Sequence, residues 1–392
     1  NGADNVTIDG RIAGSGRNIT IQNNSNTAAT AAVWLASVAA GNGATNNIIR
    51  NCNIACGAPQ NTGTLTTIGV YIGGTTISVT ATTGIDNDNN SIIDNFITKC
   101  RYGISTRGQS ATNLGQNNTI TGNIVGPASF GADQIGKTGI LAVFENNCNI
   151  SRNEIRFVGG DFANTTGGTD RIGIGLGVDA WSQSTTTTTT NTNFTVTGNI
   201  IHDIIEERTF SSCGILLATT NGGSATNDLI CSNIIYNVKA NGTSGDMTVG
   251  IGISGGHTIN VVHNSIYLYG DVDPNPSASS TTIFGAGIRI TQTTSANFAN
   301  LNIKNNAINI DLSSSSTAAN RYYAISCPNN TMSFGTGGLN NNDYYVNPLN
   351  PQCVLGGYGT TSASAHTSQF TSLAGWQGVF APGQDANSIS AN

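Results

Sequence analysis

Short apolar segments recur along the whole chain at a nearly constant spacing. Each consists of a small residue followed by apolar, variable and apolar positions, as in Gly69-Val70-Tyr71-Ile72. We call this segment the glycine cassette. Its nine copies begin 34 to 41 residues apart, at Ala32, Gly69, Gly103, Gly139, Gly173, Gly214, Gly250, Gly287 and Ala324. Such a period is typical of repeat proteins, in which each unit buries its apolar face by stacking on its neighbours.

A second pattern runs in step with the cassettes: an apolar residue, two variable residues, Asn, one variable residue and an apolar residue. Its asparagines are Asn95, Asn123, Asn153, Asn199, Asn233, Asn264, Asn306 and Asn342, and Cys52 stands in the same position of an earlier copy. Asn tolerates the left-handed backbone of a sharp corner, and stacked Asn side chains can hydrogen-bond to one another. We therefore expect a structural ladder of asparagines through about ten units.

The apolar runs are three to five residues long and are bounded by Gly or Asn, which is typical of strands and too short for helices. Only 9% of the residues are charged, and Thr, Ser, Asn and Gly dominate, a composition poor in helix formers. Parallel coils stacked about 4.8 Å apart satisfy one another's strand backbones. The sequence predicts an all-β chain, folded as a right-handed parallel β-helix, or β-solenoid, of about ten coils.

Two domains are expected, a parallel β-helix over residues 1–350 and a C-terminal capping segment or linker over residues 351–392. Long loop insertions should project from one corner, because the interval from cassette glycine to ladder asparagine varies between 14 and 26 residues. Two insertions contain Thr185–Thr190 and Asp271–Pro276. Trp376, Phe370 and Phe380 are placed to fold over the last coil as a cap, whereas the first coil is expected to be open.

No motif of a known catalytic class is present: the chain lacks a G-x-S-x-G elbow, a P-loop and an H-E-x-x-H sequence. Glycoside hydrolysis needs two carboxylates about 5 to 10 Å apart. The position after each ladder asparagine holds only Glu154 and Asp343 as acids, and these two are not on neighbouring coils. We therefore assign no catalytic residue, although loops could still carry one.

The densest polar cluster is the segment 202–208, which contains His202, Asp203, Glu206, Glu207 and Arg208. It follows a long insertion that carries Asp161, Asp170, Arg171 and Asp179. As an active site it would offer Glu206 or Glu207 as acid and Asp203 or Asp170 as base. The alternative is a solvated corner with internal salt bridges.

Neither a metal ion nor another cofactor is predicted. Asp86–Asn90 resembles the start of a calcium loop, but it lacks the glycine and the closing glutamate of an EF-hand. A structural calcium ion at this turn is the open alternative. The eight cysteines show no C-x-x-C spacing and are expected to be buried as small apolar residues, or to form disulfides near Cys52 and Cys56 or near Cys327 and Cys353.

One column of positions resembles a recognition surface. The residue that follows the second apolar position of each asparagine pattern should point outward, and along the coils it reads Arg156, His202, Tyr236, Tyr267, Asn309 and Tyr345. Aromatic rings and an Arg at steps of about 4.8 Å on a rigid face could stack on sugar rings and bind hydroxyls. The alternative is that the tyrosines only cover a strand face beneath a loop. Solvent exposure of Tyr236 and Tyr267 distinguishes the two.

Charge and hydropathy limit the partners. The net charge of −6 is small for 392 residues and is spread along the chain, whereas nucleic-acid binding requires basic clusters. No apolar run is long enough to span a membrane. Partners are expected among polysaccharides or cell-surface glycans, or by end-to-end association of the chain with itself.

Both ends resemble β-helix modules of large secreted or cell-surface proteins of Bacteroidota-type bacteria. The resemblance is carried by residues 1–10, NGADNVTIDG, by Asn341–Tyr345 and by Leu373–Gln377 with Gly383–Ile389 after it. It implies export, through the type IX route, and an extracellular or cell-surface location. It supplies no catalytic residues.

These observations favour a non-enzymatic extracellular β-helix that acts as a structural or adhesive segment and contacts glycans. A polysaccharide lyase or glycoside hydrolase on the same scaffold is the alternative. An extracellular filament built from stacked subunits is a second alternative, because an open first coil leaves strand edges unpaired.

Overall fold

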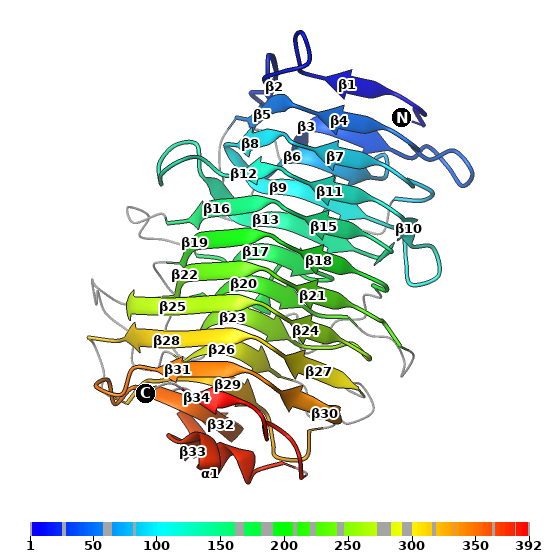
Figure 1. The fold of residues 1–392 in the computed structure, drawn as a ribbon. Coiled ribbons are helices and arrows are strands. Elements are labelled where there is room, and N and C mark those ends of the chain that lie inside the picture. The colour runs from blue at the N-terminus through cyan, green and yellow to red at the C-terminus, as the bar shows by residue number, and fades with distance from the viewer. Residues whose placement is uncertain are drawn as a thin grey trace.

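The computed structural model describes residues 2–25, 29–57, 65–80, 84–160, 168–181, 191–206, 210–219, 225–240, 247–272, 284–291, 300–315, 319–332, 334–362, 365–380 and 382–390. Thr185–Thr190, residues 273–276, Asp161, Glu207 and Arg208 of the sequence predictions lie outside these ranges. The described chain is all-β apart from one short helix, and it winds as a right-handed parallel β-helix from one end of a rod to the other (Figure 1). The predicted fold class is confirmed.

Each coil contributes one strand to each of three faces. Face 1 is a sheet of ten parallel strands, in agreement with the predicted number of coils. Its strands are β1 (Thr7–Asp9), β4 (Ile48–Arg50), β7 (Ser91–Ile93), β11 (Thr119–Thr121), β15 (Asn149–Ser151), β18 (Thr195–Thr197), β21 (Leu229–Cys231), β24 (Asn260–Val262), β27 (Leu301–Lys304) and β30 (Phe334–Asn340).

Face 2 follows face 1 in every coil, and its strands also pair in parallel. They are β2 (Ile19–Asn23), β5 (Cys52–Cys56), β8 (Phe96–Thr98), β12 (Ile124–Val125), β16 (Glu154–Gly159), β19 (Ile200–Glu206), β22 (Ile234–Ala240), β25 (Ser265–Asp271), β28 (Ala307–Ser313), β31 (Asp343–Val346) and β34 (Ile389–Ser390).

Face 3 holds the glycine cassettes and closes each coil. Its parallel strands are β3 (Ala29–Ala36), β6 (Thr66–Gly73), β9 (Cys100–Arg107), β13 (Ile135–Val143), β17 (Arg171–Leu176), β20 (Ser212–Leu217), β23 (Met247–Ile253), β26 (Phe284–Ile290), β29 (Arg321–Cys327) and β32 (Cys353–Ser362). Faces 2 and 3 join where Ile135 pairs with Val158.

The remaining elements are the pair β10 (Gly115–Gln116) and β14 (Glu145–Asn146), the antiparallel strand β33 (Ala365–Phe370) and α1 (Leu373–Gln377). Among the described residues, no helix has the length and apolar character needed to cross a membrane.

The asparagine ladder lies inside the corner between faces 1 and 2. All eight asparagines are buried, and the first seven make the same contacts with the next asparagine, while the N–H of Asn342 donates to Oγ of Ser388. The backbone N–H and the Nδ2 of Asn153 both donate to Oδ1 of Asn199, at 2.9 and 3.0 Å, while Nδ2 of Asn153 also donates to the carbonyl of Ile120. The N–H of Cys52 donates to Asn95 in the same way. The ladder therefore satisfies the backbone at a corner where strand pairing is interrupted.

The left-handed backbone falls on the residue before each ladder asparagine, and not on the asparagine itself as the sequence suggested. Positive φ angles of 54° to 68° occur in this column at Asn51, Asp94, Gly122, Arg152, Gly198, Ser232, His263, Asn305 and Asn341. A second left-handed column lies at the corner that enters face 1, and it contains Asn5, Asn46, Asn89, Asn117, Asn147, Asn193, Asn227, Thr258 and Asn300. Asn suits these positions because it adopts the left-handed region more readily than most residues.

The cassette glycines mark the closest approach of faces 2 and 3. A Cβ on Gly214 would lie 2.6 Å from Cγ2 of Ile235 and 2.7 Å from the carbonyl oxygen of Gly250. The same two contacts, with an aliphatic side chain of face 2 and with the carbonyl of the next cassette, recur at the other six cassette glycines. The recurrent glycine is thus required by packing across the core.

The connections of varying length project from two corners of the coil. The sequence predicted that they project from one corner only. The connections at the first corner join face 3 to face 1 of the next coil, as between β17 and β18. The second joins face 2 to face 3, as between β25 and β26. From the second coil onward the corner between faces 1 and 2 stays short, because the asparagine ladder occupies it, whereas residues 10–18 separate β1 from β2 in the first coil.

The C-terminal residues cover the last coil. The winding continues past residue 350, since β32 pairs with β29 as the next strand of face 3. Trp376 of α1 is fully buried in the main core, with Phe370 and Phe380 packed against that core. Its indole Nε1 donates to Oδ2 of Asp385 at 2.8 Å, and β34 then pairs with β31.

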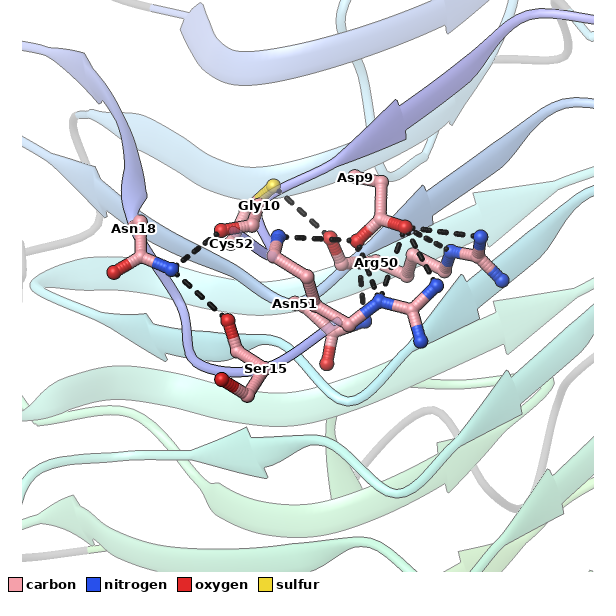
Figure 2. Close-up of polar contacts among 8 residues, drawn as sticks. Asp9, Gly10, Ser15, Asn18, Arg50, Asn51 and Cys52 are labelled. Atoms are coloured by element: carbon pink, nitrogen blue, oxygen red, sulfur yellow. Dashed lines mark hydrogen bonds and ion pairs between the residues drawn. The ribbon is translucent and has the colours of Figure 1, made fainter. Parts of the chain in front are cut away.

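The first coil is tied to the second by a group of partly exposed charges. Figure 2 shows Asp9 of β1 facing Arg50 and Asn51 of the coil below. Arg11 Nη2 lies 2.7 Å and Arg50 Nε 2.9 Å from Oδ2 of Asp9. The Arg11 guanidinium holds the pKa of Asp9 well below its usual range. We read this group as a structural contact between coils.

All eight cysteines are free, and seven of them are buried. Cys52 and Cys56 point into the core from β5, and Cys327 and Cys353 lie on different strands of face 3. The predicted burial as small apolar residues is therefore the arrangement observed, and neither of the alternative disulfides is present.

Candidate functional site

The predicted recognition stripe forms one column on face 2. Strand register pairs its members in the order Arg156, His202, Tyr236, Tyr267, Asn309 and Tyr345. Residues adjacent in a strand point to opposite sides of the sheet. Since Ile235 and Ile266 fill the core, Tyr236 and Tyr267 point outward.

A groove of about 440 Å³ lies on the outer surface of face 2, over β22, β25, β28 and β31. One wall consists of the stripe residues Tyr236, Tyr267, Asn309 and Tyr345. Tyr267 is 42% exposed, and Tyr236 and Tyr345 are half-buried. The tyrosines are therefore open to solvent, and none of the described residues seals them off.

The floor of the groove is formed by the column two residues earlier. In strand order this column reads Ile200, Ile234, Ser265, Ala307, Asp343 and Ile389. Ser265 and Ala307 are small, whereas Ile234 on one side and Asp343 on the other are larger. The groove is hollow because two successive coils carry short side chains between bulkier neighbours.

Two of the three tyrosines pack against neighbouring rings. Tyr236 stacks on His202 with ring centroids 4.7 Å apart and planes 3° apart, and Tyr267 packs on Tyr269 at 4.5 Å. Partial burial raises the pKa of Tyr236, and the carboxylates of Asp203 and Glu154 add to this effect. Within the described part of the chain, the hydroxyls of Tyr236, Tyr267 and Tyr345 have no protein hydrogen-bond partner.

The other end of the stripe is an ionic cluster and does not line the groove. His202 is 7% exposed, with Nδ1 2.6 Å from Asp203 Oδ2 and Nε2 3.3 Å from Glu154 Oε1. Arg156 Nη1 binds the same Glu154 oxygen at 2.8 Å. Both ring nitrogens of His202 are thus occupied by carboxylates. The structure brings Tyr236, Tyr267 and Tyr345 together at the groove and separates Arg156 and His202 from it.

The acids predicted as a possible catalytic group lie in two places. Asp203 belongs to the His202 cluster on face 2. Glu206 is 1% exposed and its Oε2 is 2.8 Å from Nε of Arg171, so this corner is a buried ion pair where the sequence suggested a solvated one. Asp170 accepts the backbone N–H of Ser211 at 2.8 Å.

Asp179 is the centre of a second buried group. Its Oδ2 lies 2.6 Å from Nζ of Lys137 and accepts the hydroxyl of Tyr102 at 2.7 Å. Burial alone would raise the pKa of Asp179, but the Lys137 ammonium and the Tyr102 hydroxyl outweigh it and lower that pKa. The carboxylate is therefore neutralised inside the protein and acts as a structural anion.

A serine and a histidine lie within hydrogen-bonding distance on the outer side of face 3. Nε2 of His366 is 2.7 Å from Oγ of Ser326, which also accepts Nη1 of Arg289 at 2.9 Å. Ser326 is 0% and His366 3% exposed, so no substrate reaches this pair. Burial, together with the Arg289 charge, lowers the pKa of His366 to about 4. The three residues attach β33 to the rod.

The Asp86–Asn90 turn uses its oxygens to bind neighbouring backbone. Asp86 accepts the N–H of Gly41, Asn87 accepts the N–H of Ala44, and Asp88 accepts the N–H of Gln116. Among the described residues, no group of three His, Cys, Asp or Glu side chains is arranged to hold a metal ion. The alternation of oxygens that suggested calcium is explained by contacts between coils.

The sequence reasoning missed the floor of the groove. In the sequence, Asp343 stands out only as an acid beside the ladder and as part of the Asn341–Tyr345 resemblance, and Ser265 and Ala307 in the same column do not stand out. One signal in the sequence could have indicated the groove. Two successive coils have a short side chain at the same outward position, next to a column of tyrosines. This signal indicates a groove only once the structure shows that the two columns are adjacent on the outer surface.

No family model and no curated protein matches the chain. Two solved structures are similar in fold. The Dettilon tailspike protein is 12% identical with a TM-score of 0.38, over 93% of this chain and 59% of the tailspike chain. The A-module of the mannuronan C-5 epimerase AlgE4 from Azotobacter vinelandii is 13% identical with a TM-score of 0.28, over 98% of this chain and 88% of that module. The chain thus spans somewhat more than half of the tailspike's length. These likenesses are too distant to bear on function.

Proposed function

We propose that this chain is a non-enzymatic β-helix that binds glycans in the face 2 groove and serves as a rigid structural or adhesive segment outside the cell. The observation that carries the proposal is the groove itself. Three outward tyrosines, Tyr236, Tyr267 and Tyr345, line a hollow whose floor is formed by Ser265 and Ala307.

Sugars suit such a surface for two reasons. The C–H faces of a sugar ring pack on aromatic rings, which supply a large apolar area with defined geometry. The tyrosine hydroxyls, which can both donate and accept, supply hydrogen bonds to sugar hydroxyls. A parallel sheet holds these groups rigidly at steps of about 4.8 Å. Binding would therefore cost little ordering of the protein.

The described acids give little support to a cleavage reaction. Glu206 and Asp179 are buried and paired with cations, and Glu154 is bound to Arg156 and His202. Asp343 is the acid that lines the groove. Since glycoside hydrolysis generally uses two carboxylates, these residues favour binding. A polysaccharide lyase or hydrolase is kept as an outcome of the test.

The test combines a glycan array with a polysaccharide-degradation screen. Tyr267→Ala removes an aromatic wall residue, and Ala307→Leu fills the hollow at an exposed position that does not contribute to the core. Each variant should weaken binding at least about tenfold. Trp34→Ala is the matched control, because Trp34 is 39% exposed but lies on β3 in the first coil.

Loss of binding in both groove variants but not in the control would support the proposal. Cleavage of any polymer would exclude a purely non-enzymatic role. If the unchanged protein, the two groove variants and the Trp34→Ala control all bind equally well, the glycan site lies outside the groove. The extracellular or cell-surface location is part of the same proposal and is supported by the resemblance of the chain ends to secreted β-helix modules. Protease accessibility of the protein on intact cells tests it.

A further inference from the structure

We propose that the face 2 groove selects uncharged polysaccharides over polymers of uronic acids, and that Asp343 makes this selection. The inference rests on the proposed glycan binding and adds the class of ligand.

The side chains that line the groove carry negative charge and no positive charge. Among the residues that line it, Asp343 alone has a carboxylate, and no lysine or arginine is present. Asp343 is exposed, and no ion pair involving it occurs within the described residues. The carboxylate therefore faces the groove without a compensating cation.

Strand pairing fixes the backbone position of Asp343. The N–H of Asp343 donates to the carbonyl of Asn306 at 2.8 Å, and Asp343 pairs with Ala307 on one side and Ile389 on the other. Asp343 thus follows Ala307 in the floor column. A sugar seated over Ser265 and Ala307 would meet Asp343 at the end of the hollow.

The cations near this face are already engaged. Arg156 binds Glu154 at 2.8 Å, and Nζ of Lys239 lies over the ring of Tyr269, 5.7 Å from its centroid. Beyond the tyrosine wall, the acids Glu154 and Asp203 are likewise paired, with Arg156 and His202. A polyanion entering the groove would therefore find the carboxylate of Asp343 and no free basic partner among the lining residues.

Two effects of Asp343 act in the same direction. A uronic acid polymer carries a carboxylate on every sugar, and like charges brought together in a binding site cost affinity. An uncharged sugar instead offers hydroxyl donors, and hydrogen bonds to a carboxylate are stronger than those to a neutral acceptor. Asp343 thus repels one class of glycan and attracts the other.

The experiment compares the protein with its Asp343→Asn variant by calorimetry. The probes are oligomers of glucose, xylose and mannose, and oligomers of galacturonate and mannuronate of equal length, at low and high salt. Asn has the same size and keeps the backbone contacts. Asp311→Asn is the matched control, because Asp311 lies on the neighbouring strand β28 but does not line the groove.

We expect the protein to bind at least one uncharged oligomer and to bind the uronate oligomers at least tenfold more weakly at low salt. Asp343→Asn should lose about tenfold in affinity for the uncharged oligomer and gain affinity for uronates, and Asp311→Asn should change neither. Added salt should reduce the discrimination, because the repulsion is screened.

Two failures are distinguishable. If the protein binds uncharged and uronate oligomers equally, or if Asp343→Asn leaves their ratio unchanged, this inference is wrong while glycan binding stands. If no oligomer binds to the protein or to either variant, both the inference and the proposed function fall. Circular dichroism of each variant verifies that the β-helix is retained.

Discussion

At the residue scale, asparagine has two different tasks in this rod. In the ladder it is buried, and its side-chain amide replaces strand pairing between coils. At the corner before face 1 it is exposed and supplies the left-handed backbone, and its side chain can bond to the same position of the next coil, as Asn147 Nδ2 does to Asn117 Oδ1 at 2.7 Å. The buried ladder position requires the side-chain amide. The exposed corner position mainly requires the tendency of asparagine to adopt the left-handed backbone conformation.

Asn199→Ala tests the first task. The substitution removes the acceptor of the Asn153 N–H and the donor to the Ile150 carbonyl, and both groups stay buried. Leaving buried polar groups unsatisfied should lower the free energy of unfolding by roughly 3 kcal/mol. Hydrogen exchange of the peptide that contains Asn153 should rise in parallel. Asn260→Ala, at a partly exposed asparagine, should cost less than about 1 kcal/mol. A ladder variant no more harmful than this control would contradict the role assigned to the ladder.

Glu145 provides a pH-dependent test. The side chain is 1% exposed and accepts hydrogen bonds from Thr106 and Asn118, and it has no cation partner among the described residues. Burial raises its pKa to about 7, above the value of 4.5 expected in the unfolded chain. The folded protein therefore binds a proton more readily, so stability should increase as pH falls from about 7 to about 4.5.

Glu145→Gln removes this dependence. The variant should be more stable than the unchanged protein at pH 8, by up to about 3 kcal/mol, and the difference should vanish below about pH 4.5. Thermal melts at pH 8 and pH 4.5 measure it. A difference of the same size at both pH values would mean that packing, and not ionisation, is responsible.

At the scale of the element, seven strands of face 3 approach face 2 so closely that the cassette glycine of each has no space for a side chain. Gly214→Ala places a methyl group 2.6 Å from Ile235 and 2.7 Å from the Gly250 carbonyl. Because a carbonyl of the neighbouring coil cannot rotate away, we expect a loss of about 1–3 kcal/mol. The midpoint of urea unfolding measures it. Gly378→Ala, where the nearest atom is 3.6 Å from the new methyl, should change stability by less than about 0.5 kcal/mol.

The strands also show which parts of the molecule could be predicted from sequence. The short apolar alternation gave the period, and the Asn column gave the register, because both signals repeat in every coil. The stripe through Tyr236 and Tyr267 followed from that register. The function of Asp343 could not be found in this way, since it depends on Ser265 and Ala307 being small on the coils before it. Glu145 was missed because it lies in a connection outside both repeated patterns.

At the scale of the whole molecule, the C-terminal residues determine whether rods can stack end to end. Trp376 covers the last coil and packs so closely on β32 that a Cβ on Gly356 would lie 2.3 Å from its ring. This cover lies over the surface that a filament contact at that end would use. The structure thus gives the filament hypothesis no support at the C-terminal end.

Trp376→Ala should uncover that end. Removing a fully buried Trp and its hydrogen bond to Asp385 should cost about 3–5 kcal/mol and expose the last coil, so that the protein self-associates. Light scattering and melting temperature measure the two effects. Trp376→Phe, which keeps much of the packing, should lie between the variant and the unchanged protein. A monomeric Trp376→Ala protein of unchanged stability would show that the segment is not a cap.

The repeated contacts of the asparagine ladder make the length of the rod independent of its binding groove. Asn95 and Asn153 make the same bonds to their neighbours as Asn123, which lies between them. Excision of a complete turn, such as residues 96–123, would bring two equivalent amides into contact and leave β22 to β31 unchanged. Each turn gained or lost alters the reach of the molecule by about 5 Å. Duplication or deletion of single turns would thus change the length of the rod without altering the face 2 groove.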